Sequence, residues 1–272
     1  MCPTVILGMR CARMARAMAL VVASTLGAFL PANCRTGTCH AQEFNLRDGD
    51  RVVFYGDSIT EQGHFASAVE NYVLTRLPEL NVTFFNRGWS GDCAWGGAGG
   101  GSEKRLGRDV IPLQPTVVVV MLGMNDGYYT KHDPKLLAAF QSNLAKSIAT
   151  LQRQLPDARI TILGTSPYDD VSPGDRPGWE QEIDGGYAGV VALYSRAAEE
   201  VAQSHGLTFV NMCEPLNAVL ERAQREHPEL AGQLIPDRIH PGPALGWVMA
   251  AQLMSAWNAP QIVVQIDFVA NA

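Results

Sequence analysis

The sequence predicts an α/β protein built around a parallel β-sheet. Three observations support this fold class. Segments with strand patterns alternate with segments in which apolar residues recur at helical spacing. Residues 116–122 form a continuous, largely β-branched run, which suits a strand buried on both faces of a parallel sheet. Finally, the alternation favours right-handed crossovers, and no linker or internal repeat divides the chain.

Five strands and five helices are expected between residues 51 and 257. The expected strands span residues 51–55, 82–85, 116–122, 159–163 and 207–211. The expected helices span residues 64–77, 135–155, 187–205, 215–225 and 244–257. Pro156 ends the longest helix, because proline cannot continue a helix. Gly206 ends the next helix, because glycine readily adopts the left-handed conformation that often follows the last helical residue. Residues 261–268 read as a last strand, at an edge.

Two loops differ from ordinary connections. Residues 96–101 hold five glycines and one alanine, without the Lys-Ser/Thr that would follow in a phosphate-binding loop. We therefore expect a flexible surface loop there. Residues 169–186 form a longer loop rich in proline, glycine and acidic residues. Loops of that length are often functional, and its composition does not resemble an apolar lid.

The N-terminus has the layout of a secretory signal peptide. Arg10, Arg13 and Arg16 precede an uncharged, mostly apolar run over residues 17–30, and cleavage is expected after Ala41. Residues 1–41 are thus predicted to be a signal peptide and residues 42–272 a single folded domain. The protein is expected to be secreted or periplasmic, without stable membrane insertion after cleavage. An uncleaved anchor, or a lipoprotein modified at Cys34, is the alternative.

Composition excludes several classes of protein. The 272 residues are 47% hydrophobic and 18% charged, an ordinary globular mixture that is neither disordered nor polytopic. Without the leader, 17 basic residues face 27 acidic ones, and a net charge of −10 opposes nucleic-acid binding. Cys93 and Cys213 remain, with no zinc-ligand spacing, so neither a metal nor another cofactor is expected.

Four short blocks carry polar residues, three of them directly after expected strands. They are GDSIT (56–60), NRGWSGD (86–92), GMND (123–126) and DRIHP (237–241). Each block alone has an ordinary reading, such as Ser58 capping a helix or Asp237 and His240 forming a surface pair. Ligands of parallel sheets bind beyond the carboxyl ends of the strands. Together the blocks supply a nucleophile, a base, an orienting acid and oxyanion donors.

These blocks resemble those of the SGNH hydrolases, also called the GDSL lipase/esterase family, over residues 51–241. Ile59 replaces the family's leucine. The resemblance implies a flavodoxin-like three-layer α/β/α sandwich with a five-stranded parallel sheet of order 2-1-3-4-5. It also implies ester hydrolysis through a serine acyl-enzyme. With that strand order, Cys93 and Cys213 follow opposite edge strands, so we expect no disulfide between them.

The resemblance also assigns roles by position. The implied catalytic triad is Ser58, Asp237 and His240, and the implied oxyanion hole is Ser58, Gly91 and Asn125. The chemistry agrees, because a serine hydroxyl needs an adjacent base and the acid fixes the tautomer of that base. Gly88 competes with Gly91 for the second donor. The α/β-hydrolase motif G-x-S-x-G is absent around Ser58.

The substrate is less well defined by the sequence. We expect a small acyl ester, with O-acetyl on a carbohydrate favoured, because aromatic residues with polar neighbours suit sugar rings. Candidate substrate contacts are Asp57, Trp89, Tyr128 and Trp179; the aromatic ones could instead pack loops. Alternatives are a lipase or lysophospholipase, an inactive glycan-binding module, and a metal-dependent hydrolase using His240, Asp237 and Asp57. The remaining histidines, His64, His132, His205 and His227, are expected to be solvated. The oligomeric state is left open.

Overall fold

A computed structural model describes residues 43–172 and 186–260 of the chain. Its five-stranded sheet has the order β2-β1-β5-β6-β7, and every neighbouring pair is parallel. The strands are β1 (Arg51–Gly56), β2 (Thr83–Gly88), β5 (Val117–Met121), β6 (Arg159–Leu163) and β7 (Thr208–Val210). The five strands and their order are therefore confirmed. The expected leader at 1–41 and the expected strand at 261–268 lie outside the described residues.

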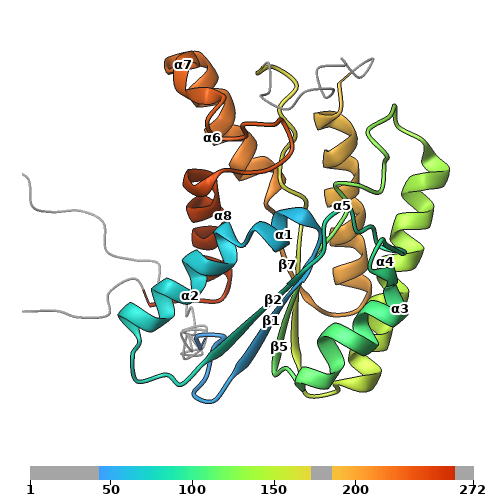
Figure 1. Cartoon of the computed structure of the whole chain (residues 1–272), viewed down its shortest axis with the longest axis vertical. Helices are drawn as coiled ribbons and strands as arrows, with labels where there is room; N and C mark the ends of the chain where they lie inside the picture. Colours follow the sequence, from blue (N-terminus) through green and yellow to red (C-terminus); the bar gives the residue numbers. More distant parts are fainter. Residues whose placement is uncertain (1–42, 173–185, 261–272) are drawn as a thin grey trace, which may run out of the picture. The chain divides into compact units, whose positions relative to one another are not determined.

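Helices cover both faces of this sheet, which gives three layers (Figure 1). The long helices are α2 (His64–Arg76), α4 (Pro134–Gln154), α5 (Ala188–Ser204), α6 (Cys213–Glu226) and α8 (Pro243–Ala256). Each lies within two residues of its expected ends. Helices α2 and α8 pack together on one face, and α4 and α5 pack together on the other. The flavodoxin-like α/β/α class is confirmed.

Short helices fill the connections for which no element was expected. They are α1 (Ser58–Gln62), α3 (Ser102–Arg105), a π-helical turn (Leu106–Val110), a 3₁₀ turn (Ile111–Leu113) and α7 (Pro228–Ala231). None is long enough for the periodicity of its apolar residues to be recognised in the sequence. Helix α1 matters most, because Ser58 is its first residue.

The glycine-rich segment is not the flexible surface loop that was expected. Gly96–Gly97 (β3) and Gly100–Gly101 (β4) form a short antiparallel pair. Gly96 has φ +111°, and a Cβ there would lie 2.2 Å from the carbonyl oxygen of Gly100. The glycines therefore permit a close approach of two backbone segments, which a sequence pattern alone does not distinguish from flexibility.

The sheet forms the centre of the core. Residues of β1 and β5 are almost completely buried, in agreement with the expected strand buried on both faces. At the end of α8, the buried Trp257 donates its indole N–H to Thr161 Oγ1 at 3.0 Å, which ties this helix to β6. Cys93 and Cys213 are buried free thiols, as predicted. Within the described ranges, no helix is both long and apolar enough to span a membrane.

Candidate active site

Ser58 stands at the carboxyl end of β1, where the chain turns into α1. Asp57 is the N-cap of this helix, and its carboxylate accepts a hydrogen bond from the N–H of Ile59 at 3.0 Å. Gly56 is closely surrounded, because a Cβ there would lie 2.3 Å from Thr60 Oγ1 within the turn and 2.4 Å from the carbonyl oxygen of Met121 on β5. Since Asp57 caps the helix, the hydroxyl of Ser58 is left for another partner.

That partner is His240, which is 182 positions away in the sequence. Its Nε2 lies 2.7 Å from Ser58 Oγ, and its Nδ1 lies 2.5 Å from Asp237 Oδ2. The three side chains thus form one continuous hydrogen-bonded chain, Ser58–His240–Asp237. All three are largely shielded from solvent. Such an arrangement can transfer a proton from the serine to the imidazole while the carboxylate stabilises the resulting cation.

The Asp237–His240 turn is held by hydrogen bonds from its own backbone N–H groups to the Asp237 side chain. Asp237 Oδ1 accepts hydrogen bonds from the N–H groups of Ile239 (3.1 Å) and His240 (2.8 Å). Burial raises the pKa of Asp237, but the hydrogen bonds from the His240 ring and from the two backbone N–H groups outweigh it and bring the pKa to about 2. Asp237 is consequently a carboxylate at neutral pH, the form that can stabilise an imidazolium.

Arg238 connects this turn to the segment after β6. It adopts the left-handed region (φ +72°), and its side chain is buried. Its guanidinium donates hydrogen bonds to the carbonyl oxygens of Asp169 (2.8 Å) and Asp170 (2.9 Å) and lies over the ring of Tyr168. In return, the Asp169 N–H donates to the carbonyl of Arg238 at 3.0 Å. The backbone that carries Asp237 and His240 is therefore fixed from both sides.

Two glycines compete as the second oxyanion donor, and the structure distinguishes them. The N–H of Gly88 already donates to Asn86 Oδ1 at 2.9 Å, and a Cβ at Gly88 would lie 2.1 Å from the Glu61 nitrogen. Gly91 is exposed in the left-handed region (φ +78°), and a Cβ at this position would meet no atom within 4 Å. Within the described part of the chain, the Gly91 N–H has no hydrogen-bond acceptor. Gly91 is therefore the better candidate.

Asn125 is oriented by two hydrogen bonds. Its Nδ2 donates to the carbonyl oxygen of Asp92 at 3.0 Å, and its Oδ1 accepts from the hydroxyl of Tyr129 at 2.7 Å. An amide nitrogen carries two N–H groups, so one remains for a further acceptor. The sequence reasoning did not identify Tyr129. The only signal for it in the sequence is a tyrosine four residues after the candidate Asn125.

A buried ion pair supports the segment between β2 and β3. Arg105 Nε donates to Asp92 Oδ2 at 2.7 Å, and the two side chains are 1% and 0% exposed. Arg105 also donates to the carbonyl of Arg87 at 2.9 Å. Nearby, Asp126 accepts a hydrogen bond from the N–H of Ala94 at 2.8 Å. These contacts hold the backbone around the candidate donor Gly91, and nothing in the sequence pattern marked Arg105 for this position.

The predicted substrate contacts lie in different environments. Tyr128 and Trp89 are 53% and 38% exposed, which is compatible with contact to a ligand. Asp57 is only 1% exposed and caps α1, an environment that does not favour the predicted contact with substrate. Trp179 lies outside the described residues. Tyr128 has φ +50°, a conformation that tyrosine rarely adopts and that is often found at functional sites.

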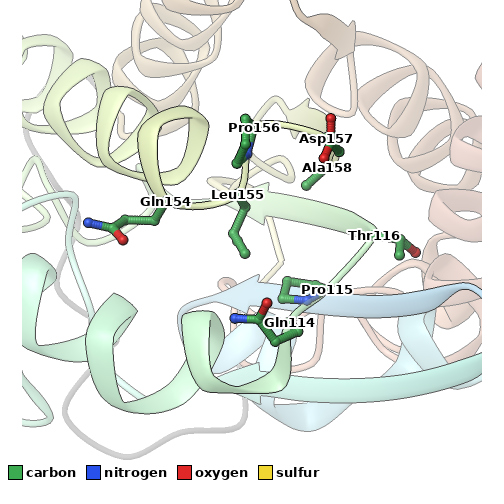
Figure 2. A pocket seen from close by; sticks show the side chains of 8 residues that line it. All are labelled: Gln114, Pro115, Thr116, Gln154, Leu155, Pro156, Asp157 and Ala158. Carbon is green, nitrogen blue, oxygen red and sulfur yellow. The ribbon is translucent and has the colours of Figure 1, made fainter.

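Two cavities lie at opposite ends of the strands, one near their carboxyl ends and one near their amino ends. The first, of about 260 Å³, adjoins the catalytic candidates. Its lining residues are Gln62, His64, Pro236, Asp237, His240, Pro241, Gly242 and Pro243. The second, of about 150 Å³, lies where β5 and β6 begin and is lined by residues 114–116 and 154–158 (Figure 2). The four blocks are therefore remote from the second cavity.

The described residues contain no group of three or more histidine, cysteine, aspartate or glutamate side chains placed to hold a metal ion. Asp57 in particular is turned to the Ile59 N–H, and His240 and Asp237 are bonded to each other through Nδ1. The ligand set considered for a metal-dependent hydrolase is thus not assembled.

A parallel α/β sheet that brings a serine, a histidine and an aspartate into one hydrogen-bonded chain at its carboxyl edge is the arrangement of a hydrolase. The chain belongs to the GDSL-like lipase/acylhydrolase family, whose family model matches residues 54–245. The resemblance to SGNH hydrolases is confirmed, and the matched domain is that of a carboxylic ester hydrolase. No curated protein sequence matches it.

Several solved structures are similar to this chain. A gut microbial diltiazem-metabolizing enzyme is 28% identical with a TM-score of 0.65, over 79% of this chain and 48% of that one. This chain thus spans about half the length of that enzyme. An acetylxylan esterase from Geobacillus stearothermophilus is 20% identical (TM-score 0.61; 78% and 96% covered). An alpha/beta hydrolase enzyme from the metagenome of Lake Arreo, Spain, is 22% identical (TM-score 0.60; 79% and 98% covered). The last two share the fold.

Proposed function

We propose that this protein is a secreted serine esterase that hydrolyses small acyl esters, in particular O-acetyl groups on a carbohydrate. Ser58 is the nucleophile, His240 the general base and acid, and Asp237 the orienting carboxylate. The observation that carries the proposal is the continuous chain of hydrogen bonds, 2.7 Å from Ser58 to His240 and 2.5 Å from His240 to Asp237.

Acylation begins when Ser58 Oγ attacks the ester carbonyl carbon while His240 Nε2 takes the hydroxyl proton. Asp237 stabilises the imidazolium that forms. The tetrahedral intermediate collapses, the carbon–oxygen bond to the alcohol breaks, and His240 gives its proton to the leaving oxygen. Water then attacks the acyl-enzyme with His240 again acting as base, which releases the carboxylic acid and restores Ser58.

The oxyanion is stabilised by three N–H groups in this proposal. The first is the backbone N–H of Ser58, which has no acceptor inside α1 because Ser58 is the first residue of that helix. The others are the N–H of Gly91 and the second amide N–H of Asn125. Loss of one such donor typically reduces turnover by about 10²–10³-fold.

The acyl and alcohol groups are proposed from the surroundings of the site. The exposed rings of Trp89 and Tyr128 and the polar neighbours of His240 suit a carbohydrate better than a lipid tail. The likeness to the acetylxylan esterase is one of fold alone. The proposal of an acetyl ester therefore rests on the residues around the site in this chain. Three alternatives remain: a lipase, a lysophospholipase and an inactive glycan-binding module. Assays with esters of different acyl chain length distinguish them from the proposed esterase.

Residues 1–41 are proposed to be a signal peptide that directs the domain at 42–272 out of the cytoplasm. The proposal is supported by the arginines at positions 10, 13 and 16 and the apolar run that follows. Mass spectrometry of the protein secreted by an expressing cell tests it. A mature chain starting near Gln42 is expected, and an intact N-terminus on a cell-retained protein would contradict it.

One experiment tests the catalytic proposal directly. Ser58→Ala should reduce hydrolysis of p-nitrophenyl acetate by about 10³-fold or more, and a fluorophosphonate should label Ser58 alone in peptide mapping. Ser142→Ala, an exposed serine on α4, is the matched control and should keep both activity and labelling. Activity should fall from acetyl to decanoyl esters. A preference for esters with long acyl chains would favour the lipase. The absence of turnover with every ester would favour the binding module.

A further inference from the structure

We propose that the cavity beside His240 is the binding site for the alcohol part of the ester, and that Gln62 and His64 recognise hydroxyl groups of a sugar ring there. This inference rests on the proposed function and deepens it, since it assigns a substrate class to a cavity next to the catalytic residues. The cavity has a volume of about 260 Å³, and Asp237 and His240 are among the residues that line it.

The direction of proton transfer places the alcohol in this cavity. The imidazole that accepts the Ser58 proton must return it to the oxygen of the departing alcohol, so that oxygen has to lie within hydrogen-bonding reach of His240 Nε2. The oxyanion donors Gly91 and Asn125 come instead from the segments after β2 and β5. The alcohol therefore extends from Ser58 toward His240, the residue that the cavity adjoins.

The lining of the cavity suits a sugar ring. Gln62 offers an amide with two donors and an acceptor, and His64 offers one donor and one acceptor on its ring when neutral. The apolar part of the wall is formed by three prolines, Pro236, Pro241 and Pro243. Hydroxyl groups around a ring can pair with the polar side chains while the C–H face of the ring packs on proline. An alkyl chain would leave the amide and the imidazole without partners, which is unfavourable.

The two polar side chains are carried on a fixed backbone. Gly63 joins α1 to α2 in the left-handed region (φ +80°), and its N–H donates to the carbonyl of Thr60 at 3.0 Å. Asn86 Nδ2 donates to that same carbonyl at 2.6 Å. A Cβ at Gly246 would lie 2.6 Å from the Cβ of His64, so α8 approaches α2 closely at this position. His64 is half-buried as a result, yet it lines the cavity.

The test compares two esters that form the same acetyl-enzyme. One is a monoacetylated methyl glycoside, whose alcohol carries hydroxyl groups; the other is p-nitrophenyl acetate, whose leaving group carries none. The ratio of kcat/KM for the glycoside to kcat/KM for p-nitrophenyl acetate reports recognition of the alcohol during acylation. Gln62→Ala and His64→Ala should each lower this ratio by about tenfold, as expected for a lost hydrogen bond. His64→Gln should recover part of it.

Matched controls lie away from the cavity. Gln154→Ala, in the cavity at the opposite end of the strands, and His227→Ala, exposed beside α7, should keep the wild-type ratio. Thermal unfolding of each variant shows whether the fold is retained, and the ratio is compared among folded variants.

The outcomes separate this inference from the proposed function. If the wild-type enzyme hydrolyses both esters through Ser58 but the ratio is unchanged in Gln62→Ala and His64→Ala, the alcohol site is elsewhere and the inference is wrong. If the ratio of kcat/KM values falls equally in Gln154→Ala and His227→Ala, the inference is likewise wrong. If the wild-type enzyme hydrolyses neither ester, or if Ser58→Ala stays active, the proposed function itself fails.

Discussion

The hydroxyl of Tyr129 donates a hydrogen bond to Asn125 Oδ1 at 2.7 Å, while Asn125 Nδ2 donates to the carbonyl of Asp92 at 3.0 Å. A carbonyl oxygen can only accept, so the Asp92 contact requires the nitrogen of the amide on that side. The hydroxyl then meets the amide oxygen as a donor. Tyr129 and Asp92 together fix the orientation of the Asn125 amide, and so which of its ends would donate to the proposed oxyanion.

Tyr129→Phe tests this orientation. The variant keeps the ring and its contacts with Tyr168 and Tyr187 but loses the hydroxyl. We expect kcat for p-nitrophenyl acetate to fall about tenfold with little change in KM, less than the fall of about 10²–10³-fold expected for Asn125→Ala. Tyr72→Phe removes a hydroxyl bonded to the carbonyl of Pro260 instead, and should leave kcat unchanged. A larger effect on KM than on kcat in Tyr129→Phe would argue against an oriented oxyanion donor.

Asp237→Asn tests the role of the carboxylate. The amide can still accept from the N–H groups of Ile239 and His240, but its NH₂ would face His240 Nδ1 and impose the wrong tautomer. We expect kcat to fall by about 10⁴-fold while the melting temperature changes by only a few degrees. Steady-state kinetics and thermal unfolding measure the two effects. A fall in kcat below tenfold would remove Asp237 from the triad.

The two glycines of the second block should differ in stability when replaced. Gly88→Ala places a Cβ 2.1 Å from the backbone nitrogen of Glu61, and we expect a loss of about 3 kcal/mol or more, or failure to fold. Gly91→Ala meets no atom within 4 Å and pays only for its positive φ, about 1–2 kcal/mol. Urea denaturation of both variants measures this difference. Equal destabilisation would show that the Gly88 contact can relax.

The buried carboxyls should make stability depend on pH. Burial raises the pKa of Asp57 and of Asp126 to about 7, well above the value near 4 of an unfolded chain. Their protonated forms are favoured in the folded state, so this stabilisation is complete below about pH 4 and is lost as the pH rises toward 7. Asp237 acts oppositely, and its stabilisation is lost as the pH falls toward 2.

Asp126→Asn removes one of these titrating groups and keeps an acceptor for the Ala94 N–H. Between pH 4 and 7, the free energy of unfolding should therefore fall less in the variant than in the wild type, by an amount on the order of 2–4 kcal/mol. Urea denaturation at several pH values measures both slopes. Identical slopes would show that Asp126 does not titrate in this range.

The regular part of the fold could be predicted because its signals are long and periodic. The run at Val117–Met121 is buried on both faces, and α4 follows an apolar repeat with a capping Asp133 before it. The short helix α1 gave no such signal, since its formation depends on Asp57 turning its carboxylate to Ile59. For the same reason, the burial of Asp57 could not be predicted from its place in the motif. Whether a carboxylate is buried depends on what packs over it.

The candidate triad could be predicted from its motifs, whereas its supporting residues could not. Ser58, Asp237 and His240 stand in short patterns. Arg105 instead contacts Asp92, 13 positions away in the sequence, and Tyr129 contributes a single hydroxyl on a common side chain. The cavity lined by Gln62 and His64 likewise depends on the packing of α2 against α8. Such features arise from tertiary contacts that no local pattern encodes.

The 182-residue separation of Ser58 and His240 has a consequence for how the protein becomes active. Ser58 is synthesised early, but its base arrives with the segment that leads into α8, which then docks on α2. A growing or truncated chain that ends before this segment carries an inert hydroxyl. During refolding, recovery of hydrolysis would consequently report the formation of this contact between residues 182 positions apart.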